Sequence, residues 1–338
     1  TQRDMSRVDS APLKYHLDEG TGKFQPAVDP KLGFKRSWNL RKLLGSHENA
    51  HNAFTLTTQA VMGAFLMSIA CQWKNNAALS AFTSSSFYLP VLELLIVVLG
   101  FGLYKLNMHL GKPHRFYRGF YNLKLSPVSR EIAGVSLFFT GLLAFTLFSL
   151  FSSSFAAVLV TLSAVLAIIG IMAGGYYMYK LYRIPARPFW DHWHTAASFT
   201  GSALYLGAAL LMLPGLVTGS LDAALATTLM TVAALGVTLE AVGIIAHAFA
   251  MKDATHEGAV SFYEQTTTYG YPYQLRNILM GITLLFTTYI MITGTTNAVL
   301  AIVTILLLLS VAVLGRAMFY VMVVPTTMPG AFFWKNKG

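Results

Sequence analysis

The ionisable side chains nearest to long apolar segments mark where this chain could do chemistry. His109 closes one apolar segment and Glu131 opens the next, with a polar stretch at residues 110–130 between them. Among the ionisable residues within or at the ends of later apolar segments, three more are candidates: Glu240, Arg276 and Arg316. Such groups are costly inside a membrane and therefore point to function. We expect proton transfer and hydrogen bonding to a ligand at one membrane surface.

Each of these residues also has a structural explanation. His109 could hydrogen-bond a ligand oxygen or cap its helix, and Glu131 could relay protons or complement a helix dipole. Arg316 stays charged and needs a partner, for which Glu240 or Glu131 is the natural choice, so a structural ion pair is the alternative. Arg276 fits a surface anchor better than a ligand contact, although it stays among the candidates.

The elements that must hold these residues are membrane-spanning helices. Of 338 residues, 55% are hydrophobic and 11% are charged, which indicates a polytopic membrane protein. The net charge is +10, and the basic residues lie in short loops beside apolar segments. There they set the topology and contact membrane lipid, so no nucleic-acid partner is expected. Cys71 is the only cysteine, so the chain cannot hold an iron–sulfur cluster alone.

Apolar segments of about 20 residues or more predict the transmembrane helices. They are eight in number: 54–73, 88–110, 130–151, 155–180, 194–217, 223–250, 274–293 and 297–324. Very short turns make the third and fourth, and the seventh and eighth, antiparallel hairpins. Several glycines suit close helix contacts: Gly170, Gly174, Gly175, Gly201 and Gly207. The expected fold class is an all-α integral membrane protein, with eight transmembrane helices in antiparallel bundles and both termini on the same side.

Three regions follow from this pattern. Residues 1–50 are a polar N-terminal arm with one helical turn near 38–44, and we expect this arm to contact a partner subunit. Residues 51–325 are the membrane domain, and 326–338 are a short C-terminal tail. Lys and Arg are concentrated on the side of both termini, whereas the opposite side has Lys74. The positive-inside rule therefore predicts cytoplasmic termini in a bacterial inner membrane.

The ionisable residues inside the spans gather toward that cytoplasmic end, with Glu93 as the main exception. A one-sided pocket suits a quinone, whose ring and tail need apolar walls and whose oxygens need hydrogen bonds and proton carriers. The alternative is a secondary transporter of an ion or small solute, which is expected to line a path across the membrane. A dihaem cytochrome is a third hypothesis, disfavoured because only His247 lies well inside a span.

Several stretches, in order along residues 51 to about 325, carry a family resemblance. The most specific are 109–113 (HLGKP), 129–132 (SREI) and 315–320 (GRAMFY). The others are 54–60 with Gly63, 182–185, and 269–270 ahead of Arg276. Together they resemble the anchor subunit of dimethyl sulfoxide reductase and the broader group of polysulfide-reductase-type membrane anchors.

The resemblance implies an anchor for a molybdopterin catalytic subunit and a four-cluster iron–sulfur subunit. Such a chain exchanges electrons with menaquinone or ubiquinone and itself holds no haem, iron–sulfur cluster or metal. In that family the histidine and glutamate of the first two motifs are linked to quinol binding, and here they are His109 and Glu131, the expected catalytic residues. Arg316 matches the family's late arginine and is given a supporting role, and Glu240 and Arg276 complete the expected quinone-binding set.

Two departures from the family pattern bear on the function. The N-terminal arm is longer than the one that the dimethyl sulfoxide reductase anchor normally has. The extra length is expected to be either a remnant of a fused iron–sulfur module or a clamp on such a module. Charge also places the end with His109 and Glu131 in the cytoplasm, which is similar to the anchor of cytoplasm-facing sulfite-oxidising molybdoenzymes. We therefore expect this chain to be the quinone-reactive subunit of an oxidoreductase complex of the sulfite-oxidising or dimethyl sulfoxide reductase type. Such a complex takes part in anaerobic respiration or sulfur metabolism.

Overall fold

Eight long helices dominate the computed structural model, which describes residues 15–17, 24–26, 36–46, 48–74, 76–252, 254 and 257–323. They are α4 (Asn49–Lys74), α6 (Tyr88–His109), α7 (Pro127–Phe148), α8 (Ser154–Tyr182), α9 (His194–Val217), α10 (Ala223–Lys252), α12 (Gly270–Thr293) and α13 (Ala298–Val321). Within the described residues, these eight are long and apolar enough to cross a membrane. The predicted all-helical membrane fold is confirmed, and each predicted span overlaps one of them.

Shorter elements connect or flank the long helices. They are α3 (Leu40–Leu44), α5 (Ala77–Thr83), the 3-10 helix η1 (Pro113–Phe120) and α11 (Glu257–Thr266). In the N-terminal arm, β1 (Tyr15–Leu17) and β2 (Phe24–Pro26) pair antiparallel, with Tyr15 opposite Pro26. The helical turn predicted near residues 38–44 is confirmed as α3. The C-terminal tail predicted at 326–338 lies outside the described residues.

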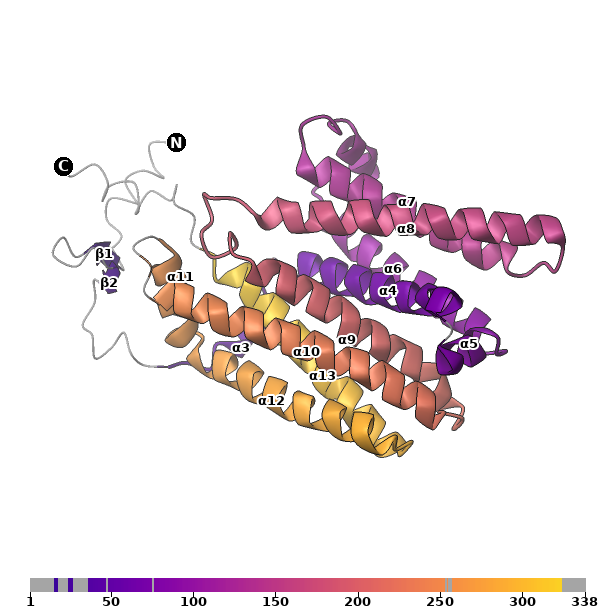
Figure 1. Cartoon of the computed structure of the whole chain (residues 1–338). Coiled ribbons are helices and arrows are strands. Elements are labelled where there is room, and N and C mark those ends of the chain that lie inside the picture. The colour runs from indigo at the N-terminus through magenta and orange to yellow at the C-terminus, as the bar shows by residue number, and fades with distance from the viewer. Residues whose placement is uncertain are drawn as a thin grey trace.

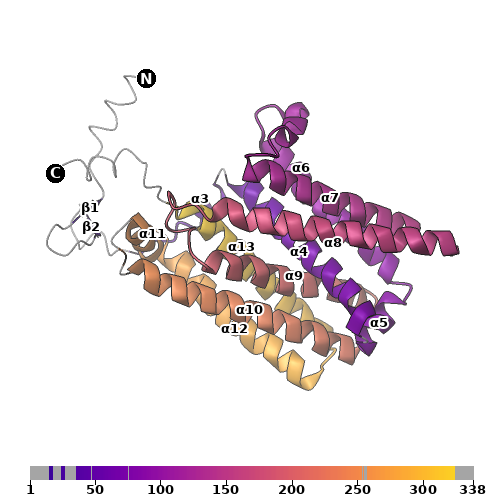
Figure 2. The ribbon, with the colours of Figure 1, turned by 45° about the horizontal axis from the view of Figure 1, so that its top comes forward.

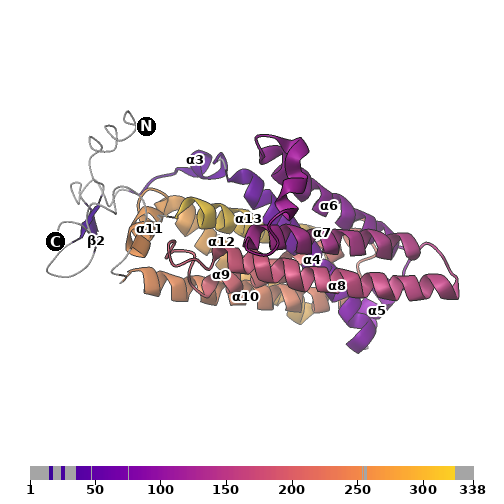
Figure 3. The ribbon, with the colours of Figure 1, turned by 90° about the horizontal axis from the view of Figure 1, so that it is seen from above.

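The helices form a bundle with α4 near its middle. Helices α7 and α8 pack along each other at one edge of the bundle, α12 lies at the opposite edge, and α4 packs against α6, α9 and α13 (Figures 1 and 2). Seen from above, the long helices run roughly along one direction (Figure 3). The two predicted hairpins are confirmed, because α7 packs on α8 and α12 packs on α13.

Small residues allow the backbones of neighbouring helices to touch. A Cβ atom added at Gly134 of α7 would lie 2.3 Å from the backbone nitrogen of Gly174 of α8. A Cβ at Gly63 of α4 would lie 1.9 Å from the carbonyl oxygen of Ala203 of α9. In lipid, where apolar burial gives helices little preference for each other, such close packing drives association. The prediction of a close contact is wrong for Gly175, because no atom lies within 4 Å of a Cβ added there.

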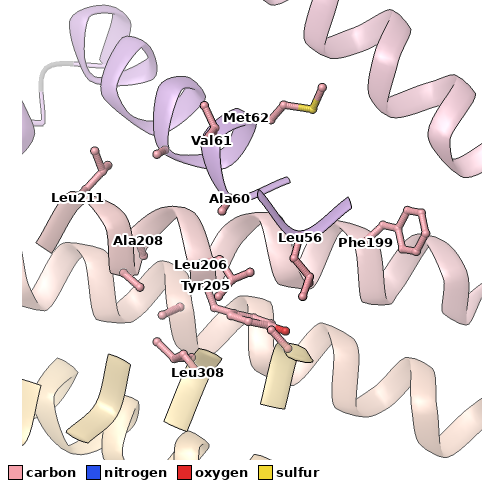
Figure 4. Close-up of a cluster of buried hydrophobic side chains, with 14 of the residues drawn as sticks. Leu56, Ala60, Val61, Met62, Phe199, Tyr205, Leu206, Ala208, Leu211 and Leu308 are labelled. Carbon is pink, nitrogen blue, oxygen red and sulfur yellow. The ribbon is translucent and has the colours of Figure 1, made fainter. Parts of the chain in front are cut away.

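The apolar core lies where α4, α9 and α13 meet. Figure 4 shows Leu56 and Ala60 from α4 beside Leu206 from α9 and Leu308 from α13. Tyr205 of α9 is fully buried in the same region. This packed core fixes the three helices relative to one another. It thereby also fixes the positions of the polar side chains that these helices carry nearer one end.

The first and last long helices meet at one end of the bundle. The rings of His51, in the first turn of α4, and Tyr320, in the last turn of α13, have centroids 6.0 Å apart. The His109 ring, at the end of α6, lies 5.2 Å from that of His51. We call this the polar end, because the ionisable residues singled out from the sequence, apart from Glu93, lie in the halves of their helices nearest to it.

Candidate functional site

A cavity of about 550 Å³ opens on the side of the bundle at the polar end, and we call it the lateral cavity. Its walls come from α4, α6, η1, α7 and the last turn of α8. Exposed Tyr104, Phe116 and Val128 form its rim, whereas Val135 and Tyr182 on its floor are buried. The volume and the mostly apolar lining are those of a site for a small organic ligand.

Glu131 reaches this cavity because of how α7 begins. Ser126 caps the helix by accepting a hydrogen bond from the Ser129 backbone N–H at 3.3 Å, and Pro127 occupies the first helical position. The carboxyl group therefore projects from the second turn, where the side chain is 5% exposed and lines the lateral cavity. A buried carboxyl group beside an open cavity is suited to taking up and releasing protons.

Three further polar side chains line the lateral cavity beside Glu131. They are His51 of α4, Asn107 of α6 and Tyr182 of α8. The side-chain oxygen of Asn107 is buried and has no hydrogen-bond partner in the described structure, so this acceptor is unsatisfied beside the cavity. His51 Nδ1 lies 3.1 Å from the carboxylate of Glu48, which connects this imidazole to a partly exposed acid.

His109 does not line the lateral cavity. It is exposed at the end of α6, and its ring packs edge-on against the ring of His51, which does line the cavity. His51 thus stands between the predicted histidine and the site. The sequence reasoning did not single out His51, because this residue lies at the boundary that was drawn between the polar arm and the first span.

A polar stripe runs from His51 into the membrane domain. His51, Thr55 and Gln59 follow one another at four-residue spacing on α4, so they lie on one face of the helix. They face Arg316 and Tyr320 of α13, which are also four residues apart. The Tyr320 hydroxyl lies 2.7 Å from that of Tyr182. Polar residues at this spacing in an apolar segment were the available signal for the stripe.

Arg316 is buried at 4% exposure, and its partner is not the one expected. Its Nη2 donates to Gln59 Oε1 at 2.7 Å and to Ser202 Oγ at 2.9 Å, and its guanidinium lies 4.0 Å from the Phe199 ring centroid. Among the described residues, no carboxylate lies within 4 Å of it. The predicted ion pair with Glu240 or Glu131 is therefore wrong, and neutral oxygens are the partners of Nη2 instead.

Arg316, Glu240 and Arg276 line a second, much smaller space among buried side chains, which we call the internal cavity. Its volume is about 30 Å³, room for one or two waters. Glu240 accepts a hydrogen bond from the Tyr205 hydroxyl at 2.9 Å, and Arg276 donates to Asn277 Oδ1 at 2.7 Å. Arg276 is 5% exposed, so it is not the surface anchor that its position suggested. Of the five predicted site residues, Glu131 lines the lateral cavity, Glu240, Arg276 and Arg316 line the internal cavity, and His109 lines neither.

The aromatic loop after α8 closes the polar end. Trp190 stacks on Phe319 of α13, with ring centroids 5.5 Å apart, and its indole N–H donates to the Phe319 carbonyl oxygen. An apolar and aromatic sequence after a span is typical of an interfacial belt, but Phe189 and Trp190 are buried inside the bundle, and Trp193 is the exposed tryptophan of this loop. An ion pair between Arg183 and Asp191, 2.7 Å long, holds the ends of the loop together.

Three histidines meet beneath this loop. The ring centroid of His247 lies 3.9 Å from that of His194 and 5.3 Å from that of His192. His192 lies in the loop outside the spans, and its burial, followed by the charge of nearby Arg183, lowers its pKa below the usual range. His194 and His247 line the internal cavity, which places them away from the lateral cavity.

The lateral cavity combines the groups that proton-coupled chemistry needs. Its walls are mostly apolar, Asn107 has an unpaired amide oxygen, and Glu131 and His51 can each accept and donate a proton. The contact from His51 to exposed His109 provides a route toward solvent or a docked partner. The arrangement can hold a planar polar headgroup and exchange protons with it.

Comparison with known proteins identifies one family. A family model described as DMSO reductase anchor subunit (DmsC) matches residues 44–322, which include all eight long helices and both cavities. A search of curated proteins found no match to the chain.

Proposed function

The chain belongs to the family of DMSO reductase anchor subunits, and on that premise we propose that it binds a quinone in the lateral cavity and exchanges electrons with an iron–sulfur partner. The single observation that carries the proposal is the buried Glu131 carboxyl group facing an apolar cavity of about 550 Å³. Family membership makes the chain a multi-pass membrane anchor that associates with catalytic and iron–sulfur subunits of a DMSO reductase-type complex.

The residues present fit a quinone headgroup. The apolar side chains of α6, α7 and η1 would enclose the ring and the start of the tail, and the exposed rim would let the tail pass into lipid. Asn107, whose unpaired amide oxygen is an acceptor, would accept a hydrogen bond from a hydroxyl of the reduced headgroup, the quinol. A bound quinone supplies two-electron, two-proton chemistry.

We assign the proton handling to three residues of this chain. Glu131 takes up or releases a proton at the floor of the lateral cavity, and His51 does so at its upper wall. His109 passes protons between His51 and the outside of the bundle, since the two imidazole rings pack edge-on with their centroids 5.2 Å apart. Arg316 supports the pocket indirectly, because it hydrogen-bonds Gln59, which lies on the same face of α4 as His51.

Glu240 and Arg276, the other two expected quinone-binding residues, line the internal cavity instead. A direct contact of either residue with quinone has no support in this geometry, and we leave both out of the proposed quinone site.

We propose that the partner docks over η1 and the segment that follows it. This surface carries exposed Phe116, Tyr117 and Tyr121 together with the cations Arg115 and Arg118. Exposed aromatic side chains next to arginines are typical of protein interfaces. Because η1 also forms part of the wall of the lateral cavity, a cluster held there by the partner would lie near the quinone.

The finer assignments of the proposal follow from charge and family. The partner is a four-cluster iron–sulfur subunit joined to a molybdopterin catalytic subunit, and the quinone is menaquinone or ubiquinone. The polar end faces the cytoplasm of a bacterial inner membrane, as the excess of Lys and Arg there predicts. Identifying the catalytic subunit that co-purifies decides between the sulfite-oxidising and dimethyl sulfoxide reductase types.

The test is the substitution Glu131→Gln in the purified complex. Glutamine keeps the shape of the side chain but cannot take up or release a proton. We expect quinone-coupled turnover to fall by about 10²-fold or more, while turnover with an artificial redox dye at the catalytic subunit is unchanged. The matched control is Glu93→Gln, at the opposite end of α6, which should leave both activities unchanged. Wild-type quinone kinetics in Glu131→Gln would refute the assignment, and solute flux by the chain alone would favour a transporter.

A further inference from the structure

The internal cavity has an imbalance of buried charge. Two guanidinium groups line it, Arg276 at 5% exposure and Arg316 at 4%. Of the described residues that line it, Glu240 is the one carboxylate. Arginine remains charged inside proteins, so the lining carries one more positive than negative charge even when Glu240 is ionised and both histidines are neutral. A buried charge without a counter-charge is strongly unfavourable.

Two buried nitrogen atoms at this cavity also have no partner. Arg316 Nη1 and His194 Nδ1 are inaccessible to solvent and make no hydrogen bond in the described structure. The other terminal nitrogen of Arg316 is fully engaged by Gln59 and Ser202. Arg316 Nη1 is a donor, and His194 Nδ1 is one in the tautomer that carries its proton there. Buried polar atoms are nearly always satisfied in native proteins, so a water or an ion is expected beside these two nitrogens.

The size of the cavity limits what this can be. A volume of about 30 Å³ admits a water molecule or a monatomic anion but excludes a phosphate, a carboxylate ligand or a quinone ring. Water would satisfy the donors but would leave the excess positive charge. A halide ion is only slightly larger than water and would answer both requirements.

We propose that the internal cavity binds one chloride-like monovalent anion, held by Arg276, Arg316 and His194. The anion balances the charge of the cavity lining, because it and Glu240 together match the two positive charges of Arg276 and Arg316. Tyr205, which donates to Glu240 on the far side, keeps that carboxylate in place while the guanidinium groups face the anion. The site is independent of the proposed quinone site, because no residue lines both cavities.

The test is binding of radioactive chloride to the purified complex in gluconate buffer of constant ionic strength. We expect saturable binding displaced by unlabelled chloride, with affinity reduced about tenfold or more in Arg276→Gln and retained in Arg276→Lys. Lys180→Gln removes an exposed cation from the last turn of α8, outside the cavity, and should bind chloride as the wild type does. Comparing the variants assigns the binding to this chain rather than to its partners.

A second variant keeps the proposal open to refutation if Arg276→Gln fails to assemble. Glu240→Gln removes the competing negative charge, so chloride affinity should rise. Absence of saturable chloride binding in the wild type would overturn the proposal. Equal affinity in wild type and Arg276→Gln, or weaker binding in Glu240→Gln, would do the same.

Discussion

The contact between two histidine rings at the lateral cavity predicts that His51 and His109 act in series. His109 is exposed and does not line the cavity. His51 does line it, and the centroids of the two imidazole rings lie 5.2 Å apart. A proton that uses this route must pass both imidazoles. Removing either histidine should therefore interrupt the same step.

The magnitude follows from this serial arrangement. A positioned acid–base group contributes about 10²- to 10⁴-fold to rate, so each of His51→Ala and His109→Ala should slow quinone-coupled turnover by about 10²-fold, or about 2.7 kcal/mol. If the two acted independently, the double variant would lose about 10⁴-fold, or about 5.4 kcal/mol. In series, it should lose only about 10²-fold, which corresponds to a coupling energy of about 2.7 kcal/mol.

The assay is steady-state quinone-coupled turnover of the purified complex, normalised to turnover with an artificial redox dye. His192→Asn is the control histidine variant, because it lies outside the lateral cavity and Asn retains an acceptor for the His194 backbone N–H. Multiplicative losses in the double variant would refute the series arrangement. A normal rate in His51→Ala would remove His51 from the pathway altogether.

Three other predictions concern stability and follow from packing, hydrogen bonding and titration. Gly134→Ala forces a Cβ into the backbone of α8 and should lower the free energy of unfolding by about 1–3 kcal/mol, measured as a lower unfolding temperature in detergent. Gly175→Ala is the control, because its Cβ meets no atom and the unfolding temperature should not fall. Gln59→Leu leaves the Arg316 Nη2 donor without its 2.7 Å acceptor and should lower the free energy of unfolding by about 1.5–3 kcal/mol in denaturant titration, with a smaller loss in Gln59→Glu. The folded chain lowers the pKa of His192 by burial and by a neighbouring guanidinium, so this contribution to stability is complete above the unfolded pKa of about 6.5 and decreases as pH falls below it. His192→Asn should therefore lose less unfolding temperature than wild type between about pH 7 and 5, and an identical loss in both would show that this imidazole does not contribute.

The sequence predicted the fold because membrane-spanning helices are specified locally. About 20 consecutive apolar residues suffice to define a span, and all eight spans, both hairpins and the turn at α3 could be read without knowledge of any long-range contact. The position of Glu131 near the start of its helix was also predictable, since Ser126 and Pro127 mark that start. The gathering of ionisable residues toward one end follows from the same counting of positions along the spans.

What the sequence could not predict is which ionisable groups share a cavity. A span fixes the depth of a residue, but the direction of its side chain depends on which helices pack beside it, and that depends on close contacts such as Gly63 with Ala203. Packing of this kind placed Glu131 in the lateral cavity and Arg316 in the internal one.

The sequence by itself thus determined the number, length and order of the helices, and it identified residues whose charge makes them costly in lipid. Only the tertiary structure brought His51 between His109 and the lateral cavity, and gave Arg316 the neutral partners Gln59 and Ser202. The physical reason is that hydropathy is a property of each segment alone, whereas hydrogen bonds and cavities arise between segments that meet only after the bundle has packed.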